Sequence, residues 1–386
     1  MANATFKRNI YALAINGFLR GVGVSIFQTL FPLYALYLGY KLSGIGVVIT
    51  AANLIIIPII PFIGLLIDYY GRKPFIIITG VMTVFSLLII SIFKIYIALI
   101  ISYALFQLAF LAGQPARGAL ITESVTEAEI GGAVGLITSA FFVSRLFMPS
   151  VSGLLADLIG YNQTFLFGSV AALIGTLIFL IYGIETLIRR RKIKREDLIN
   201  LLKPSPGLGW FYIAVILDRS SWMLWFPLVN AYLGSFYRLT ATQVGILNST
   251  IFLATATTQY AIGKWIDKIG CIKGLILSEL IGCTSALLLG LINSIYAVIL
   301  AFILFGLTIS FWIPSYNKAV SLNTKMERRA LEFSKLNTYR SLASTPSPYI
   351  GGIMYDYIAP SLPFIISSLL MMTVAVIFYR KISLNR

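Results

Sequence analysis

Long apolar runs, separated by short polar segments, dominate the pattern of hydrophobic and polar positions along the chain. Runs such as Ile76–Phe93 and Ala286–Phe311 contain no charged residue and do not alternate between apolar and polar positions. Strands of a membrane β-barrel alternate over about 10 residues, so the pattern excludes that architecture. Because a helix needs about 20 mostly apolar residues to cross a bilayer, each long run predicts a transmembrane helix.

Charge clusters and Gly or Pro turns divide the chain into twelve predicted helices. In the first half they cover residues 9–38, 44–67, 74–93, 95–121, 131–157 and 162–184. In the second half they cover residues 209–236, 243–266, 274–293, 295–321, 331–356 and 361–379. Several segments exceed 20 residues, which implies tilted helices or helix ends outside the bilayer. The predicted fold class is therefore an all-α membrane protein with twelve transmembrane helices.

The composition agrees with this fold class and excludes several functions. Hydrophobic residues make up 58% of the 386 residues and charged residues only 11%, whereas soluble domains contain about 25% charged residues. The chain has no His and no GxxxxGK[ST] loop, which excludes a Ser-His-Asp triad, an HExxH metal site and this type of ATPase. Cys271 and Cys283 alone give no disulfide framework. We expect no metal, no cofactor and no enzymatic activity.

The positive charges predict the orientation in the membrane. The formal net charge is +16, and 23 of the 30 Lys and Arg residues fall at the two termini, in even-numbered loops or at the helix ends that adjoin those loops. Basic residues stay on the cytoplasmic side, so both termini are predicted to be cytoplasmic and the chain to lie in the plasma membrane. The exceptions are Lys41, Lys94 and Arg238 on the other side, and Arg20, Arg145, Arg219 and Arg340 within the predicted spans.

A basic run at 189–195 lies in the central loop between the two halves. We interpret it as a topology anchor near anionic lipid headgroups. A nucleic-acid-binding arm is the alternative, and nucleic acid is not among the partners that we expect.

An internal repeat relates the two halves. At a constant shift of 199 residues, eight Gly, Pro or Asp residues of the first half coincide with identical residues of the second. The pairs are Gly46/Gly245, Gly64/Gly263, Asp68/Asp267, Gly71/Gly270, Pro115/Pro314, Pro149/Pro348, Gly153/Gly352 and Asp157/Asp356. Because the shift spans an even number of helices, the repeats are parallel. The predicted domains are two six-helix bundles, 1–184 and 209–386, joined by a basic cytoplasmic linker, 185–208.

One member of this repeat carries a motif. The segment Gly64–Pro74 reads GLLIDYYGRKP, and Gly263–Lys273 is a degenerate copy of it. The motif resembles the G-x-x-x-D-(R/K)-x-G-R-(R/K) signature of the major facilitator superfamily, although Tyr69 stands where a basic residue is usual. The resemblance implies two bundles related by a pseudo-two-fold axis along the membrane normal, with a cytoplasmic gate at the motif. The implied gate residues are Gly64, Asp68, Gly71, Arg72, Lys73, Gly263 and Asp267. A loop that only sets topology is the alternative.

The small and charged residues of the motif have physical roles that we can anticipate. Gly64 permits close helix contact, as small residues do in membranes, and Gly71 permits a tight turn. Asp68 can pair with Arg72 or face the positive N-terminus of a neighbouring helix.

A second segment, Arg145–Gly153, resembles a degraded form of the fifth-helix motif of facilitator antiporters. Met148 and Ser152 depart from that motif. Drug antiporters of the family also carry an Arg early in the fourth helix, and residues 103–107 contain none. Both departures argue against a proton-coupled drug exporter of the familiar type.

Polar residues inside the predicted spans are candidates for the transport pathway. A charge at the bilayer centre costs about 2.5–3.5 kcal/mol even on the lenient insertion scale, so the four Arg should face a wet cavity or a partner. The predicted cavity residues are Asn16, Arg20, Gln28, Arg145, Asp218, Arg219, Trp222, Gln259 and Arg340.

Each candidate also has a structural interpretation. Arg145 and Arg340 could bond carbonyls at turns broken by Pro149 and Pro346, and Trp222 could serve only packing. Asp218 could merely neutralise Arg20 or Arg219. Glu279, on a helix that is peripheral in the family, is expected to be a structural partner. The glutamates Glu123, Glu127 and Glu129 are expected to pair with Arg117 or with the basic loops.

The charges of the spans predict the substrate. Four Arg against Asp218 and Glu279 leave a positive cavity, which favours a small anionic or polar organic solute moved by alternating access. Asp218 is the candidate for ion coupling, with uniport or anion exchange left open. The alternatives are multidrug or metabolite efflux by proton antiport and, from another class, a lipid flippase or a non-transporting receptor. We expect the solute, a possible co- or counter-transported ion and membrane lipid as partners of a monomer.

Overall fold

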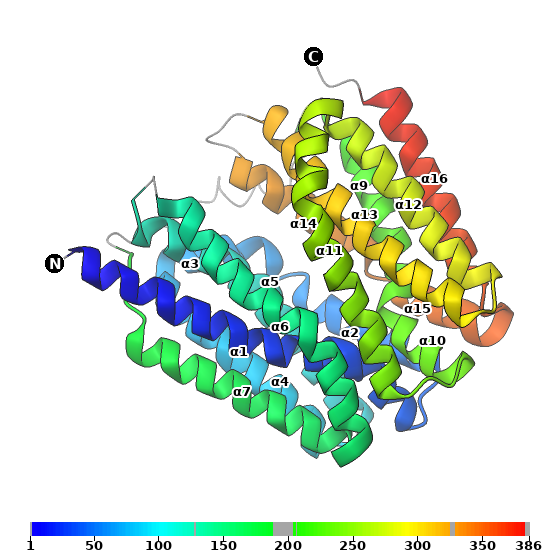
Figure 1. Cartoon of the computed structure of the whole chain (residues 1–386), viewed down its shortest axis with the longest axis horizontal. Helices are drawn as coiled ribbons and strands as arrows, with labels where there is room; N and C mark the ends of the chain where they lie inside the picture. Colours follow the sequence, from blue (N-terminus) through cyan, green and yellow to red (C-terminus); the bar gives the residue numbers. More distant parts are fainter. Residues whose placement is uncertain (1, 127–128, 188–203, 206, 325–328, 383–386) are drawn as a thin grey trace. The chain divides into compact units, whose positions relative to one another are not determined.

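The computed structural model describes residues 2–126, 129–187, 204–205, 207–324 and 329–382 (Figure 1). Within these ranges the chain forms helices joined by short turns and contains no strand. The all-α fold class predicted from the sequence is confirmed. The chain divides into two compact units: the first comprises residues 1–38, 51–198 and 238–246, and the second comprises residues 39–50, 199–237 and 247–386.

The first unit is built on five long helices and one broken helix. The long helices are α1 (Ala2–Tyr37), α4 (Arg72–Ile92), α5 (Tyr96–Ser124), α6 (Ile130–Ile159) and α7 (Tyr161–Tyr182). The broken helix consists of α2 (Leu42–Ile56), η1 (Ile60–Phe62) and α3 (Ile63–Tyr70), and residues 42–50 of α2 belong to the second unit. Helix α1 packs on α6 and α7, while α4 packs on α5 and α7.

The second unit has more interruptions. Its helices are α9 (Gly209–Trp225), η3 (Phe226–Leu228), α10 (Val229–Phe236), α11 (Ala241–Ile269), α12 (Cys271–Leu291), α13 (Ile295–Leu322), α14 (Arg329–Ser344), α15 (Ser347–Ile353), η5 (Met354–Ile358) and α16 (Leu362–Lys381). The first residues of α11, up to Ile246, belong to the first unit. Helix α9 packs on α14, α15 and α16, and α12 packs on α13 and α16. Helices α9 and α1 thus each pack on several helices of their own unit.

Every one of the twelve predicted segments coincides with helix. In the described ranges, eight helices are long and apolar enough to cross a membrane. A ninth results if α2 and the segment Ile60–Tyr70, which meet at 43°, count as one. Pro227 falls in η3 between α9 and α10, and Pro346 falls between α14 and α15, because proline cannot continue the helical hydrogen bonds. The remaining segment, α11, is one helix rich in Ser, Thr, Asn and Gln.

Four of the repeated residue pairs form two equivalent contacts, one in each unit. In the first unit, the carboxylate of Asp157 accepts hydrogen bonds from the backbone N–H groups of Ala241 (3.2 Å) and Thr242 (2.8 Å) at the start of α11. Gly153 and Gly245 lie where the two backbones approach so closely that a Cβ would clash. Asp157 therefore caps α11, because a helix N-terminus favours an anion.

The second unit repeats this arrangement with the matching residues. Asp356 accepts a hydrogen bond of 2.6 Å from the N–H of Ser43 at the start of α2. Gly352 meets the backbone of Leu42 and Ser43, and Gly46 meets that of Pro348. The repeat at these positions thus preserves a contact between a helix end and a helix start.

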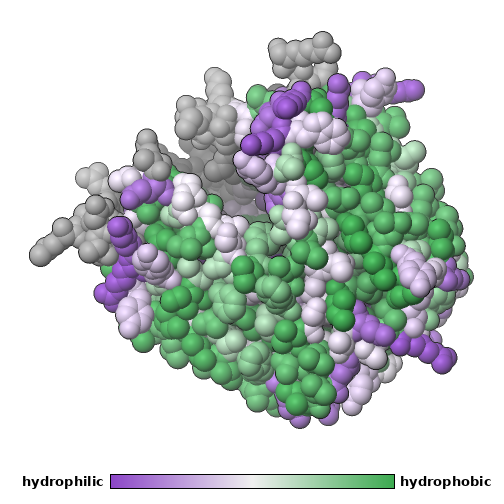
Figure 2. Space-filling model, in the orientation of Figure 1, coloured by the Kyte–Doolittle hydropathy of each residue, from purple (hydrophilic) through white to green (hydrophobic). Residues whose placement is uncertain are grey.

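The surface of the helices is apolar, unlike that of a soluble protein. On the face shown in Figure 2, hydrophobic side chains cover most of the surface and hydrophilic residues gather toward its periphery. Phe147 on α6 and Leu369 on α16 expose 61% and 60% of their surfaces. Large exposed apolar surfaces mark contact with lipid or with another protein, and the length of the helices fits a bilayer.

Candidate functional site

Three arginines on three helices of the first unit lie close together. Arg20 comes from α1, Arg117 from α5 and Arg145 from α6. The guanidinium carbons of Arg20 and Arg145 lie 4.9 and 5.6 Å from the centroid of the Phe141 ring, and that of Arg20 lies 6.0 Å from the ring of Phe110. Like-charge repulsion from Arg20 acts on both Arg117 and Arg145. We call these three residues the arginine cluster.

Two members of the arginine cluster form no ion pair within the described part of the chain. Arg20 and Arg117 are 6% and 7% exposed, and neither forms an ion pair with a residue that the structure describes. Arg20 Nε, Arg117 Nε and Arg117 Nη1 are buried donors without a hydrogen-bond partner. A buried charge without a partner is costly, so an anion that accepts from these donors would be strongly favoured.

Small and polar neighbours position the other guanidiniums. Gly113, one turn before Arg117 on α5, leaves the space that the Arg117 guanidinium fills. Arg145 Nη2 donates a hydrogen bond of 2.5 Å to Gln28 Oε1 on α1. Of the predicted cavity residues of this unit, the structure thus brings together Arg20, Gln28 and Arg145.

Asn16 has a different neighbour. Its side-chain amide donates to the carbonyl of Gly175 on α7 at 2.9 Å, and the residue is buried. The three predicted cavity residues of α1 therefore serve two purposes: Asn16 joins helices, whereas Arg20 and Gln28 lie with Arg145.

Arg117 is the residue of this cluster that the sequence analysis missed. We expected Glu123 to pair with Arg117 or with the basic loops, and it binds Arg72 of the basic loop before the predicted span 74–93, with an Nη2–Oε1 distance of 2.9 Å. The signal was available, because Arg117 falls inside the predicted span 95–121 and the cost of inserting a charge applies to it as well.

The second unit contains a cluster of opposite character, formed by Asp218, Glu279 and Arg340. Asp218 lies on α9, Glu279 on α12 and Arg340 on α14. Arg340 Nη2 and Asp218 Oδ2 form an ion pair of 3.2 Å, and their side chains are 15% and 2% exposed. Glu279 is 2% exposed, and its carboxyl group interacts with that of Asp218 by charge. We call these three residues the carboxyl cluster.

Aromatic rings enclose the carboxyl cluster. The guanidinium carbon of Arg340 lies 5.5 Å from the ring of Trp312 and 5.2 Å from that of Tyr316, both on α13. Trp222, one turn after Asp218, packs on Phe305 at 4.7 Å between ring centroids and also contacts Gly282. Trp222 therefore packs beside the carboxyl cluster, which agrees with the packing role considered for it from the sequence.

The two remaining predicted cavity residues lie differently. Arg219 follows Asp218 on α9 and acts on its carboxylate by charge. Gln259 is half-buried on α11 and forms no hydrogen bond with Asp218 or Arg340. Arg340, for which a role at a broken turn was the alternative interpretation, pairs with Asp218 through its guanidinium.

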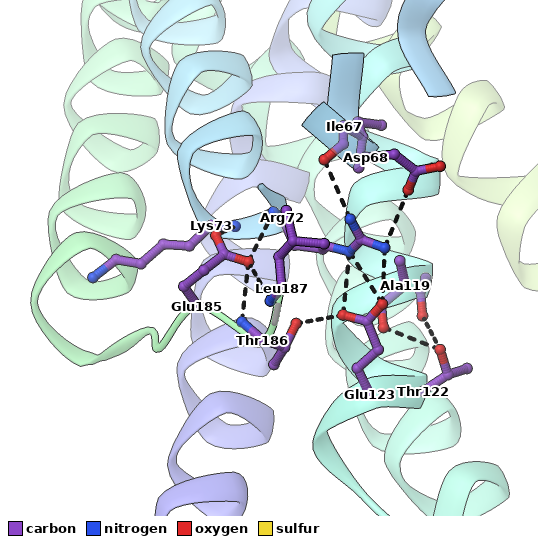
Figure 3. A network of polar contacts seen from close by, with 11 residues as sticks. Ile67, Asp68, Arg72, Lys73, Ala119, Thr122, Glu123, Glu185, Thr186 and Leu187 are labelled. Atoms are coloured by element: carbon purple, nitrogen blue, oxygen red, sulfur yellow. Dashed lines mark hydrogen bonds and ion pairs between the residues drawn. The ribbon is translucent and has the colours of Figure 1, made fainter. Parts of the chain in front are cut away.

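The motif of the first unit is organised around Arg72 at the start of α4 (Figure 3). Arg72 pairs with Asp68 at 3.1 Å and with Glu123 at 2.9 Å, and its Nη1 donates to the carbonyl of Ile67 at 3.3 Å. The guanidinium thus ties the end of α3 to α5. The side chain of Lys73 extends away from this network (Figure 3).

A second carboxylate caps the same helix start. Glu185 accepts from the N–H groups of Arg72 (3.1 Å) and Lys73 (2.9 Å). Gly71 has a φ of 109°, and a Cβ there would lie 2.6 Å from Glu185 Oε2. The turn therefore requires glycine both for its backbone conformation and for space.

The degenerate copy in the second unit is simpler. Asp267 pairs with Lys318 Nζ at 2.6 Å, and the Asp267 side chain is 71% exposed. Gly270 has a φ of 91°, as Gly71 does in the first copy. Within their own units, Gly64 and Gly263 have no described atom within 4 Å of a Cβ, so the close helix contact expected of Gly64 is not present there.

Comparison with known proteins gives consistent results along the whole chain. The model of the family described as Major Facilitator Superfamily matches residues 13–217 and 211–385. The chain is 24% identical over 366 residues to the multi-drug resistance efflux pump PmrA of Streptococcus pneumoniae, covering 91% of this chain and 90% of the relative. It is also 24% identical over 394 residues to the multidrug resistance protein MdtG of Proteus mirabilis, covering 98% of this chain and 96% of that protein.

A solved structure has the same fold as this chain. The chain resembles the crystal structure of a mutant of the nucleoside transporter NupG with a TM-score of 0.80 and 15% identity, covering 96% of this chain and 98% of the other. The similarity extends over both units and supports the two-bundle architecture.

Proposed function

The chain belongs to the major facilitator superfamily, and we propose that this multi-pass membrane transporter moves a small anionic or polar organic solute across the plasma membrane by alternating access. The distribution of Lys and Arg favours an orientation with both termini in the cytoplasm. The proposed transporter works as a monomer in contact with membrane lipid, with a small solute and a coupled ion as its partners.

The positive charges of Arg20 and Arg117 carry this proposal. Arg20 and Arg117 lie almost fully buried without an ion pair in the described structure, beside Arg145. Charges interact far more strongly in the protein interior than in water, so the cluster repels cations and attracts anions. A guanidinium presents a planar fork of donors that matches a carboxylate or a phosphate.

The surrounding residues suit an organic anion. Phe141 and Phe110 hold the guanidinium of Arg20 over their faces, as cation–π contacts do. These rings also offer apolar surface to the carbon skeleton of a solute. Gln28, which binds Arg145, adds an amide that can hydrogen-bond to polar groups.

We assign the motif around Asp68 and Arg72 to the cytoplasmic gate, with its degenerate copy at Asp267. The network that joins α3, α4 and α5 through Arg72 consists of charge-assisted hydrogen bonds, which are stronger than neutral ones. Such a network can be broken and remade in one step, as a latch between two states requires.

A second candidate function is the export of several unrelated drugs. The names of the relatives from S. pneumoniae and P. mirabilis, a multi-drug resistance efflux pump and a multidrug resistance protein, favour it. Drug pumps that carry hydrophobic cations need exposed carboxylates on the pathway, whereas the described charges of the first unit's cluster are positive. Substrate charge therefore separates the two candidates.

The proposal is tested by flux into proteoliposomes that contain the purified protein. Radiolabelled organic mono- and dianions, neutral sugars or nucleosides, and hydrophobic cations are compared at equal concentration. We expect anions to be transported and to compete with one another. Transport of cations alone would favour the drug-export candidate and reject the proposal.

An Arg20→Gln variant assigns the flux to the arginine cluster. The matched control is Arg380→Gln, which removes an exposed arginine in the last turn of α16. Anion flux should fall in the first variant and persist in the control. Binding of a solute without any flux in the unaltered protein would point to a receptor, and movement of labelled lipid instead of solute to a flippase.

A further inference from the structure

The carboxyl cluster has more acidic groups than its hydrogen bonds explain. Asp218 and Glu279 are both almost fully buried, at 1% and 2% exposure. Arg340 is the cation that pairs with Asp218, and no ion pair of Glu279 is present among the described residues. Two carboxylates against one bonded guanidinium would leave a buried negative charge without a partner, which is costly.

Three carboxylate oxygens of the carboxyl cluster lack a hydrogen-bond donor. Asp218 Oδ2 accepts from Arg340, but Asp218 Oδ1, Glu279 Oε1 and Glu279 Oε2 are buried without a donor. The helices that carry the two carboxyl groups meet within one turn of them, where Gly282 on α12 lies against Trp222 on α9, so Glu279 lies beside Asp218 and can share a hydrogen with it. Two ionised carboxylates have no hydrogen to share, because an ionised carboxylate only accepts. One proton on either group supplies the missing O–H donor.

The titratable and charged groups around this pair lie on its own two helices and on α13 and α14. On their own helices, Asp218 meets Arg219 and Trp222, and Glu279 meets Cys283. Helix α14 presents Arg340, and α13 presents Tyr316, whose hydroxyl is also buried without a partner. Helix α15 contains no Asp, Glu, Lys or Arg, and the basic residues of α16, Arg380 and Lys381, lie in its last turn.

We propose that Asp218 and Glu279 share one exchangeable proton and that this pair is the ion-coupling site of the transporter, with Arg340 as its switch. The inference rests on the proposed function only in that it needs transport to be coupled to the pair. It also gives Glu279 a role that the sequence analysis had assigned to structure alone.

The protonation step is a simple transfer. A proton from water binds one carboxylate, which becomes a carboxylic acid and donates its O–H to the other carboxylate. The cluster then holds one acid, one carboxylate and one guanidinium, so Asp218, Glu279 and Arg340 sum to no net charge. Loss of the proton breaks that O–H···O bond and leaves two carboxylates that repel each other.

Arg340 is placed to respond to the loss of the proton. Its Nη2 already binds Asp218, while its Nε is a buried donor without a partner. Its charge also acts on Glu279. The second carboxylate, once ionised, can accept from the unused donor of Arg340, which draws α14 toward α12. Because α14 ends at Ser344 and α15 begins only at Ser347, the part that carries Arg340 can shift without α15.

Infrared difference spectroscopy tests the proton directly and needs no substrate. The full-length protein in lipid nanodiscs is compared between acidic and alkaline pH, and the C=O stretch of a buried protonated carboxylic acid is followed. We expect one such band, which disappears at alkaline pH and is absent in both Glu279→Gln and Asp218→Asn. Glu129→Gln, which removes an exposed carboxylate at the start of α6, should keep the band.

The outcomes separate this inference from the proposed substrate class. A band that persists unchanged in both Glu279→Gln and Asp218→Asn would overturn the shared proton, whatever the transporter carries. If Glu279→Gln does not fold, Asp218→Asn decides alone, because either carboxyl is needed for the pair. In proteoliposomes, the two variants should lose accumulation driven by a pH gradient and Glu129→Gln should retain it. Gradient-driven accumulation that survives in both variants would reject the coupling role.

Discussion

The arginine cluster of the first unit and the carboxyl cluster of the second unit occupy related places in a duplicated chain but differ in charge. At the shift of 199 residues, Arg117 corresponds to Tyr316, and Phe141 corresponds to Arg340. In the first unit the guanidiniums of Arg20 and Arg145 lie against Phe141, whereas in the second unit that of Arg340 lies against Tyr316. Cation and aromatic ring have thus exchanged places between the repeats.

The exchange shows how duplication can divide the work of a transporter. In the carboxyl cluster the arginine is paired with a carboxylate, that of Asp218, while Arg20 and Arg117 of the arginine cluster have no ion pair among the described residues. A cation without an ion pair can bind an anionic substrate, which supplies the missing negative charge. A cation that is paired with a carboxylate can be released when that carboxylate takes up a proton. Substrate recognition and ion coupling are therefore expected to fail separately in mutants.

The largest effect is expected from breaking the paired cation. Arg340→Gln leaves the buried Asp218 carboxylate without its partner, and breaking a buried pair in this way costs about 3–5 kcal/mol. We expect a correspondingly large fall in the free energy of unfolding, measured by denaturant titration in detergent micelles.

The double variant Asp218→Asn/Arg340→Gln is the control, because it removes both charges. It should recover most of the lost stability. Equal destabilisation of the single and double variants would show that Arg340 acts through packing against Trp312 and Tyr316, and the contrast between the clusters would be lost.

The second effect concerns the unpaired cations. Arg117→Gln should weaken anion binding by about 1.5–3 kcal/mol, the usual worth of a hydrogen bond to a charged group, which corresponds to about 10- to 100-fold in affinity. The free protein should become no less stable, because the repulsion from Arg20 is relieved. Isothermal titration with the anion identified by flux measures the first quantity, and thermal unfolding in detergent the second. A strong loss of stability would reveal a hidden structural role.

A smaller effect should follow from Gly113→Ala. The added methyl group occupies the space of the Arg117 guanidinium and forces it to another rotamer without removing its charge. We expect the anion Kd to rise by less than in Arg117→Gln, and Gly118→Ala, where a Cβ has open space, to leave it unchanged. Equal Kd values for Gly113→Ala and the unaltered protein would mean that the position of Arg117 is unimportant.

The smallest effect is expected at the exposed motif copy. Asp267→Asn removes an ion pair whose acidic side chain is 71% exposed, and exposed pairs contribute about 0–1 kcal/mol. Asp68→Asn disturbs the denser network around Arg72 and should slow transport more. Initial rates of flux compare the two. A larger slowing in Asp267→Asn would reverse the assigned importance of the two copies.

The helical layout could be predicted from the sequence because hydrophobic runs and turn residues are local signals. The internal repeat also identified residues with equivalent structural roles. Gly153 and Asp157 in the first unit and their counterparts in the second unit form the same backbone contact. Such residues are fixed by geometry that side-chain chemistry cannot replace, which is why they survived the divergence of the two halves.

The partners of the charged residues could not be predicted in the same way. From the sequence, Asp218 was considered as an ion-pair partner of Arg20 or Arg219. In the structure it pairs with Arg340, 122 residues away. Glu279 was placed at the periphery, but Gly282 on the same helix lets Trp222 approach closely, so α12 lies nearer to α9 than its place in the order implied. Depth along a helix follows from sequence, whereas the direction of a side chain depends on packing.

The capped starts of α2 and α11 have a consequence for how the gene can be divided. Residues 238–246 belong to the first unit, held there by Asp157, although they follow the linker 185–208. A first-half polypeptide that ended in the linker would lack them and would leave Asp157 with bare acceptors. Residues 39–50 pose the same problem for the second half, through Asp356. Each half made alone is therefore incomplete, and function should return only when both fragments are synthesised in the same cell.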